Sequence, residues 1–261
     1  MTSASLFAEL RSELNVLVTL AQADLRARYG RGGFRIVKWL LDPFALLGIY
    51  LILVTFVLDR PGTAPGLSLA CAIVPFQLVM ATVTNATGAI HARESIILNM
   101  KFDRSLIPAA TVLTETVAFV ASLSMIALMM IAYRVEPTPA LVWYPAVFVV
   151  NVALAAGIAY PAALFGLWFR ELRVFAISLV RAMFFLAPGL VPLAAASSTA
   201  ESVLRFNPLT GLFEAYRDVF LFGTSPSAFD LLYPLGIGLV LLAVFVPVYR
   251  SEQAQFAKVV E

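Results

Sequence analysis

The chain has 261 residues, of which 61% are hydrophobic and only 13% are charged. A soluble domain is about 45–50% apolar and about 25% charged, so this composition excludes a water-soluble fold and indicates an integral membrane protein. A single cysteine and a single histidine exclude a disulfide framework and paired-imidazole metal sites, and a net charge of +2 does not indicate a nucleic-acid partner. We therefore expect no metal site.

The N-terminal segment is typical of an amphipathic helix that lies in the membrane interface. In residues 5–28 apolar side chains recur at helical spacing, with charges on the other face. A basic, glycine-containing run follows, and the arginines expected to meet lipid headgroups are Arg26, Arg28, Arg31 and Arg35. The alternative is a simple anchor ahead of the first span. A cleaved signal peptide is not expected, because residues 1–35 lack an uninterrupted apolar core.

Six later stretches are long and apolar enough to cross a bilayer, which takes about 20 residues. They are 39–58, 67–90, 106–132, 141–169, 174–196 and 229–249. The predicted fold is therefore all-α: one transmembrane domain over 1–261, with an interface segment 1–38, six spans within 39–249 and a tail 250–261. Six spans place both termini on one side. That side holds 13 lysines and arginines against 4 on the other, which predicts cytoplasmic termini.

Between the fifth and sixth spans, residues 203–222 form an apolar stretch that carries too many charges to cross lipid. Asn207 can cap a helix and Pro208 suits its first turn. Glu214, Arg217 and Asp218 share the face opposite the apolar one. We expect a short extracytoplasmic helix or a re-entrant hairpin before the last span.

The sequence lacks the motifs of an ATPase or a hydrolase, with no Walker A loop and no nucleophile elbow. Within the spans, Glu115 and Arg181 have opposite charge and similar predicted depth, which favours an intramembrane ion pair. Contact of one of them with an anionic substrate, or a role in gating, remains open.

Three motifs in order along the chain resemble one transporter family. The first is Asp24-Leu25-Arg26-Ala27-Arg28-Tyr29 followed by Gly33, Trp39 and Leu41-Asp42-Pro43, and the second lies in the loop 89–108, with Asn99, Lys101, Phe102, Arg104 and Leu106-Ile107-Pro108. The third is Phe206-Asn207-Pro208-Leu209-Thr210 followed by Glu214-Ala215-Tyr216-Arg217-Asp218. Together they resemble the membrane subunit of polysaccharide-export ABC transporters, a branch that includes O-antigen, capsule, teichoic acid and galactan exporters. Ala187-Pro188-Gly189 and Arg31-Gly32-Gly33-Phe34 depart from the usual motifs, which leaves the substrate within the family open.

The resemblance implies that two copies of this chain form the pore in a bacterial plasma membrane. Two copies of a separate ABC ATPase, which carry ATP and Mg²⁺, would bind from the cytoplasm, and this chain would bind no cofactor and catalyse no reaction. The cargo would be a lipid-linked glycan. The residues expected to contact the ATPase are His91, Arg93, Glu94, Lys101, Asp103 and Arg104, and the extracytoplasmic motif comprises Asn207, Pro208, Tyr216 and Arg217. A merely solvated, positively charged loop is the alternative for 91–105.

Side chains that suit a glycan are candidates for the channel wall. Aromatic rings match the apolar faces of sugars, and polar groups suit a wet conduit. The candidates are Phe76, Gln77, Asn85, Tyr160, Phe184 and Phe185. Packing between helices or contact with lipid is the alternative for each of them. At the level of the whole protein, the alternatives are an exporter of drugs or free lipid and a non-transport membrane scaffold.

Overall fold

The computed structural model describes residues 3–29, 34–57, 64–100, 102–190, 193, 198–253 and 256, and every regular element in these ranges is helical. The longer helices are α1 (Ser3–Tyr29), α2 (Phe34–Ile52), α3 (Pro65–Ala86), α5 (Leu106–Ala132), α6 (Tyr144–Trp168), α7 (Arg173–Phe185), α9 (Pro208–Arg217) and α10 (Ala228–Glu252). The shorter ones are η1 (Leu53–Val57), η2 (His91–Arg93), α4 (Glu94–Asn99), η3 (Pro139–Trp143), η4 (Arg170–Leu172), α8 (Ser198–Leu204) and η6 (Asp218–Phe222).

Four segments of the described chain are long and apolar enough to cross a membrane. They are α3, α5, α6 together with η3, and α10, of 22, 27, 30 and 25 residues. This confirms the predicted class, a multi-pass helical membrane protein, and α5 has the bounds predicted for the third span. The predicted fifth span, 174–196, corresponds to α7, which has only 13 residues and ends at Phe185. Residues 191–192 and 194–197 of that span lie outside the described residues.

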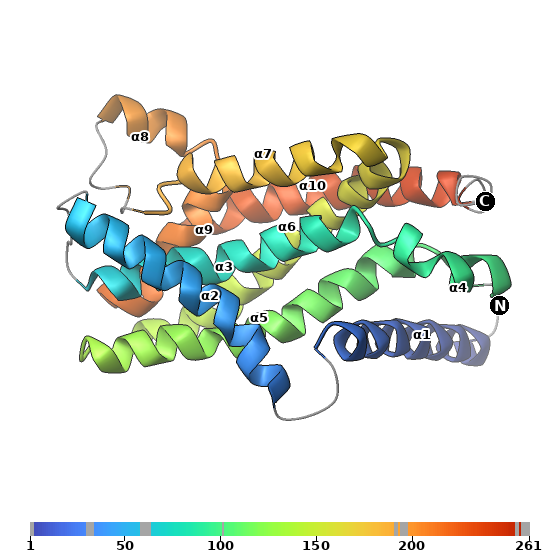
Figure 1. Cartoon of the computed structure of the whole chain (residues 1–261), viewed down its shortest axis with the longest axis horizontal. Coiled ribbons are helices and arrows are strands. Elements are labelled where there is room, and N and C mark those ends of the chain that lie inside the picture. Colours follow the sequence, from blue (N-terminus) through green and yellow to red (C-terminus); the bar gives the residue numbers. More distant parts are fainter. Residues whose placement is uncertain are drawn as a thin grey trace.

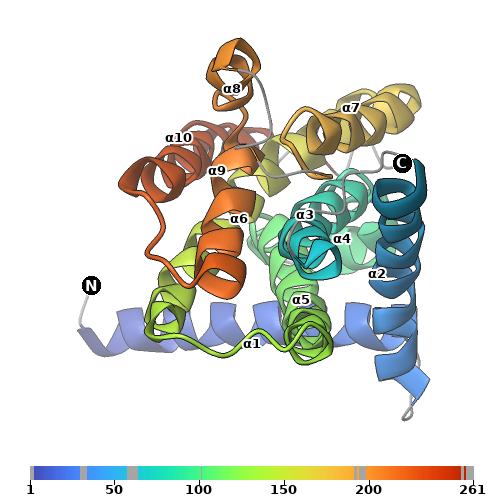
Figure 2. The same ribbon diagram turned by 90° about the vertical axis from the view of Figure 1, so that its left-hand side faces the viewer.

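The helix α3 occupies the centre of the bundle and is covered by α5, α6 and α9 (Figure 1). In contrast, α10 packs along α6 and has many exposed side chains, including Leu239, Val240 and Val244. Figure 2 shows α1 running across the bundle, where it packs against α5. Its Leu20 and Ala21 are buried while Leu14 and Val18 are exposed. The predicted helix over 5–28 is thus confirmed as a helix.

Close contact between α6 and α10 depends on small residues. A Cβ added to Gly157 would lie 2.4 Å from the carbonyl oxygen of Gly238, so the two backbones touch there. Near the end of α6, a Cβ on Gly166 would lie 1.9 Å from the carbonyl oxygen of Thr87. Membrane helices use such small residues because packing, rather than a hydrophobic effect, holds them together in lipid.

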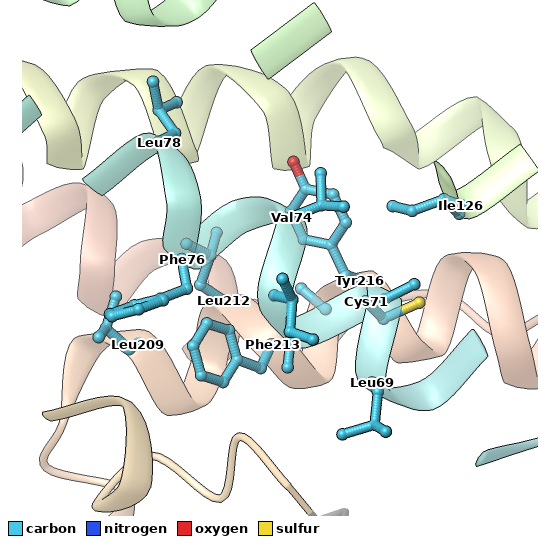
Figure 3. Packing of buried hydrophobic residues seen from close by; sticks show 14 of the residues in the cluster. Leu69, Cys71, Val74, Phe76, Leu78, Ile126, Leu209, Leu212, Phe213 and Tyr216 are labelled. Atoms are coloured by element: carbon cyan, nitrogen blue, oxygen red, sulfur yellow. The ribbon is translucent and has the colours of Figure 1, made fainter. Parts of the chain in front are cut away.

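The short helix α9 is embedded against α3 and does not lie on the surface. Figure 3 shows side chains of α3, such as Val74 and Phe76, packed against Leu212, Phe213 and Tyr216 of α9. The predicted helix start is confirmed, because the Asn207 side-chain oxygen accepts a hydrogen bond from the Leu209 amide at 3.0 Å and Pro208 is the first helical residue. The Asn207 amide group also donates to the carbonyl of Met183 at 2.8 Å, which ties α9 to α7.

Candidate functional site

Residues 87–105, called the connecting loop below, fold back between α3 and α5 through η2 and α4. Four arginines meet around this loop, and we call this end of the bundle the basic end. They are Arg93 and Arg104 of the loop, Arg173 at the start of α7 and Arg250 near the end of α10. The loop is therefore one of the places where α1 and α10 are joined to the central helices, and Arg173 of α7 lies beside it.

Arg93 links the connecting loop to α1. Its guanidinium donates to the Asp24 carboxylate and to the carbonyl of Ala89, the latter at 3.1 Å. The residue is only 5% exposed, although the sequence placed it among the contacts to a partner. In this conformation Arg93 stabilises the loop internally. Its guanidinium is buried and paired, so it is not available to another protein.

Arg104 and Asp103 link the loop to the end of α10. Arg104 donates to the carbonyl of Gln253, and Asp103 pairs with Arg250 at 3.6 Å. Asp103 also accepts a hydrogen bond from the Ser105 amide at 2.9 Å, which shapes the turn into α5. Because of these contacts, a displacement of the loop would also displace the end of α10.

Tyr160 supports the same turn from α6. Its hydroxyl donates to the carbonyl of Ser105 at 3.2 Å, and its ring lies perpendicular to that of Tyr249 with centroids 5.6 Å apart. Tyr160 is therefore packed beneath the loop in the single chain, although the sequence proposed it as a channel residue.

The surface that the connecting loop presents outward comes from α4. Glu94 is exposed, as are the apolar side chains of Leu98 (44%) and Met100 (61%). A groove of about 500 Å³ lies beside them, lined by Ile97, Leu98, Asn99, Met100, Phe102, Asp103, Arg104 and Gln253. His91 is half-buried, and Lys101 lies outside the described residues. This mixture of apolar and charged groups is suited to a protein partner.

Of the arginines predicted to meet lipid headgroups, Arg26 is exposed on α1. Arg31 lies outside the described residues, as do the side chains of Arg28 and Arg35. The role predicted for these residues therefore stays a prediction.

A hydrogen bond between Asn85 and Glu115 joins α3 to α5. The Asn85 amide donates to the Glu115 carboxylate at 2.8 Å, and Glu115 is 3% exposed. No ion pair joins Glu115 to Arg181 in the part of the chain that the structure describes, and Arg181 is exposed on α7. The predicted pair rested only on opposite charge and similar depth. The packing of the helices places the two side chains in different surroundings.

An aromatic cluster joins α2, α3, α7 and α9. The Phe184 ring contacts those of Phe76, Tyr50 and Phe213, with centroids 4.7, 5.6 and 5.7 Å away. Phe76 and Phe184 are buried, so in the single chain they serve packing, and Gln77 beside them is half-buried. Phe185 is half exposed and meets the edge of Tyr50 at 6.2 Å.

The exposed surface of α7 carries one charged residue among apolar ones. It carries Arg181 between Ser178 and Phe185, all three exposed. An arginine near the centre of a bilayer costs about 2.5–3.5 kcal/mol on insertion scales, and such residues face a bundle interior or a wet cavity. Arg181 is therefore unsuited to direct contact with lipid tails, whereas Val174, Phe175, Leu179 and Leu186, which are also exposed on or beside α7, are apolar.

At the opposite end of the bundle a buried arginine holds three segments together. Arg217 is 0% exposed and donates to Glu214 at 2.6 Å, to the Ser68 hydroxyl at 3.2 Å and to the carbonyl of Pro188 at 3.1 Å. Glu214 also accepts a hydrogen bond from the Leu193 amide at 3.0 Å. These bonds tie α9 to α3 and to the segment after α7. The sequence motif contains Arg217 and its partner Glu214, whereas the other two partners, Ser68 and Pro188, lie far away along the chain.

Tyr216 makes the matching contact to α6. Its hydroxyl accepts a hydrogen bond from the Asn151 amide at 3.4 Å, and both residues are buried. The described residues contain no group of three or more His, Cys, Asp or Glu side chains that could hold a metal ion.

No family model matches the chain. It is similar over nearly its full length to curated permeases. It is 26% identical over 253 residues to the O-antigen export system permease protein RfbA of Myxococcus xanthus, which covers 96% of this chain and 97% of that protein. Two proteins of the same name from Klebsiella pneumoniae are each 24% identical over 247 residues, covering 94% of this chain and 95% of the relative.

Proposed function

We propose, from its homology to O-antigen export permeases over about 95% of its length, that this chain is the membrane subunit of an ABC exporter. It moves a lipid-linked polysaccharide from the cytoplasm across the bacterial plasma membrane. A separate ABC ATPase supplies the energy, since this chain has no Walker A loop, and the chain itself forms the path without catalysing a reaction. The collinear similarity to these permeases carries the proposal.

The proposed topology has six crossings in one domain over 1–261. In addition to the four long helices, α2 with η1 provides 24 continuous helical residues and α7 with the segment after it provides the fifth crossing. The basic end faces the cytoplasm, as the positive-inside rule requires, and both termini lie there. The short α9 and η6 form the re-entrant element on the outer side, which agrees with the packing of α9 against α3.

The connecting loop is the proposed contact with the ATPase. Glu94 and Leu98 of α4 and Met100 directly after it are exposed and form the proposed contact surface, to which His91 and Lys101 are also expected to contribute. Arg93, Asp103 and Arg104 set the position of that surface through their bonds to α1 and α10. A movement of the ATPase on binding ATP is thereby passed to α1 and α10 together.

Two copies of the chain enclose the proposed path, and the exposed side of α7 contributes to its wall. Phe185 is the aromatic candidate exposed on that side, while Gln77, Asn85 and the buried rings of Phe76, Tyr160 and Phe184 reach a path only if the helices separate. On the cytoplasmic side, Arg26, Arg28, Arg31 and Arg35 meet the lipid headgroup, with about 1 kcal/mol from each cation near an anionic surface.

The proposal is tested by purifying this chain with the ABC ATPase of its transport system and measuring ATP hydrolysis in lipid, with and without lipid-linked glycan. The triple variant Glu94→Ala, Leu98→Ala, Met100→Ala should assemble poorly with the ATPase while the chain itself stays folded. A matched control, Val142→Ala, Trp143→Ala, Phe222→Ala, removes exposed apolar groups elsewhere and should assemble normally. A stable complex that ignores glycan would move the cargo to drugs or free lipid. A chain that binds no ATPase would contradict the proposal and favour a scaffold.

A further inference from the structure

Arg181 is an exposed cation on α7 that forms no hydrogen bond or ion pair with any residue that the structure describes. It shares its side of the helix with Ser178 and Phe185, and we call these three residues the Arg181 face. None of the contacts described above uses the charge of Arg181.

Contacts between α7 and α3 establish the depth of Arg181 in the membrane. Arg173, at the start of α7, donates to the carbonyl of Thr84 at 3.0 Å, close to the end of α3 at Ala86. Phe184 meets Phe76, which lies at the midpoint of α3, with ring centroids 4.7 Å apart. Arg181 precedes Phe184 by three residues, or about 4.5 Å along the helix. Arg181 therefore lies level with the middle part of α3, a helix long and apolar enough to cross the membrane.

Two aromatic residues, Phe185 and Tyr50, lie in the neighbourhood of this cation. Phe185 follows Arg181 by one helical turn and lies edge-on to the Tyr50 ring at 6.2 Å. Arg181 is also within electrostatic range of the Tyr50 hydroxyl. The face thus combines a cation with apolar ring surfaces and a hydroxyl group, which can bind an anion that is attached to a less polar molecule.

The carboxylates described at membrane depth are already engaged within the chain. Glu115 is buried and accepts a hydrogen bond from Asn85, and Glu214 pairs with Arg217. Asp230 is buried and accepts a hydrogen bond from Ser227. Because a second copy of the chain would hold these groups in the same way, none of them is available as the counter-charge of Arg181. The remaining sources of an anion are the Asp42 carboxylate of a second copy, whose side chain lies outside the described residues, and the cargo, and the charge-reversal test below distinguishes the two.

We propose that Arg181 binds an anionic group of the cargo, a phosphate or a carboxylate, as the cargo passes the middle of the membrane. A guanidinium suits this task because it donates two parallel hydrogen bonds to either anion. Two sources share this chemistry, namely the diphosphate that links a lipid carrier to a glycan and acidic groups on the glycan itself. The inference rests on the proposed function and adds to it that the cargo is recognised by its negative charge.

The test uses the intact complex with the ABC ATPase in phosphatidylcholine vesicles, whose lipids carry no net charge. ATP hydrolysis is titrated with four probes, namely polyprenyl diphosphate without sugar, a free glycan with uronic acids, a free neutral glycan and polyprenyl diphosphate linked to the neutral glycan. Arg181→Gln should raise the half-saturating concentration of an anionic probe by about tenfold or more. Arg181→Lys should give a smaller increase, since lysine keeps the charge and loses the paired geometry. The control variant Arg205→Gln, which changes an exposed arginine away from α7, should have the same half-saturating concentrations as the unsubstituted complex.

Each outcome decides a separate question. A shift confined to the two diphosphate probes supports recognition of the lipid-linked diphosphate, and a shift confined to the uronic acid probe supports recognition of the glycan. Unchanged titrations in Arg181→Gln overturn this inference and leave the proposed function intact.

If Arg181→Gln fails to assemble, Arg181→Lys replaces it in the test. An unchanged titration in Arg181→Lys then overturns the inference, and a shifted one supports it. A defect of Arg181→Asp that Asp42→Arg repairs identifies an ion pair between two copies and also overturns it. If the unsubstituted complex responds to no probe, the proposed function fails and this inference fails with it.

Discussion

The guanidinium of Arg93 donates a hydrogen bond to the carboxylate of Asp24, 69 residues earlier in the chain. This contact joins α1 to the connecting loop, although α2 and α3 separate them in sequence. The pair adds a direct link to the loop beside the packing of α1 against α5. In the proposed exporter, the pair therefore transmits the movement of the ATPase to the segment that meets the lipid headgroup.

Replacing Asp24 should uncouple the two elements. Asp24→Asn leaves the buried guanidinium with a weaker acceptor, which we expect to cost about 1–3 kcal/mol of stability. In the complex, stimulation of ATP hydrolysis by lipid-linked glycan should fall several-fold, while binding of the ATPase through α4 persists. The measurements are thermal unfolding in detergent and hydrolysis in vesicles.

The control for this variant is Glu13→Gln, which changes an exposed carboxylate on the same helix. It should have no effect on either measurement. The double reversal Asp24→Arg with Arg93→Asp should recover part of the lost stimulation. Normal stimulation in Asp24→Asn would show that α1 does not depend on this pair.

The buried Arg217 should be among the most sensitive positions in the chain. Glu214→Gln leaves the guanidinium buried without a counter-charge, and breaking such a pair costs about 3–5 kcal/mol. The exposed pair of Arg205 and Glu201 offers a matched comparison at 3.0 Å, where Glu201→Gln should cost less than about 1 kcal/mol. Thermal unfolding of both variants in the same detergent checks the difference. Equal losses would mean that Arg217 contributes no more than a surface pair.

The sequence predicted the elements well where a local signal defines them. Apolar length predicted α5, and the pair Asn207-Pro208 predicted the start of α9, because both signals lie within the element itself. The side chains at the candidate site were harder to place. Arg93 belongs to a loop that charge bias marks as solvated, and its burial depends on Asp24 of a distant helix. Glu115 and Arg181 have matching depth and opposite charge. The direction in which each side chain points from its helix, however, depends on packing between helices, which no local sequence pattern indicates.

The contact between α6 and α10 should tolerate no additional methyl group at Gly157. The added Cβ would lie 2.4 Å from a backbone oxygen of Gly238, so the helices must move apart, and overpacking of this kind costs about 1–3 kcal/mol. Gly236 lies on the same helix α10 with nothing within 4 Å of an added Cβ. Gly236→Ala should therefore be neutral or stabilise the helix by up to about 1 kcal/mol. Unfolding temperatures of Gly157→Ala and Gly236→Ala compare the two, and a stable Gly157→Ala would contradict the close contact.

The carboxyl group of Asp218, in the short η6 on the proposed outer side, should make stability depend on pH. Burial raises its pKa from 3.8 to about 6, and the nearby Glu214 and Asp230 act in the same direction. Because the pKa is higher in the folded protein than in the unfolded chain, the folded state binds more protons between these two values. The contribution of this group to stability is therefore fully present below about pH 4 and is lost as the pH rises through about 6.

Asp218→Asn should accordingly raise the unfolding temperature at pH 7.5, and the difference from the unsubstituted protein should shrink as the pH falls to 4. Glu136→Gln, which changes an exposed carboxylate between α5 and η3, is the control and should give no such trend. A difference for Asp218→Asn that stays constant over this pH range would show that the carboxyl group is not buried as described.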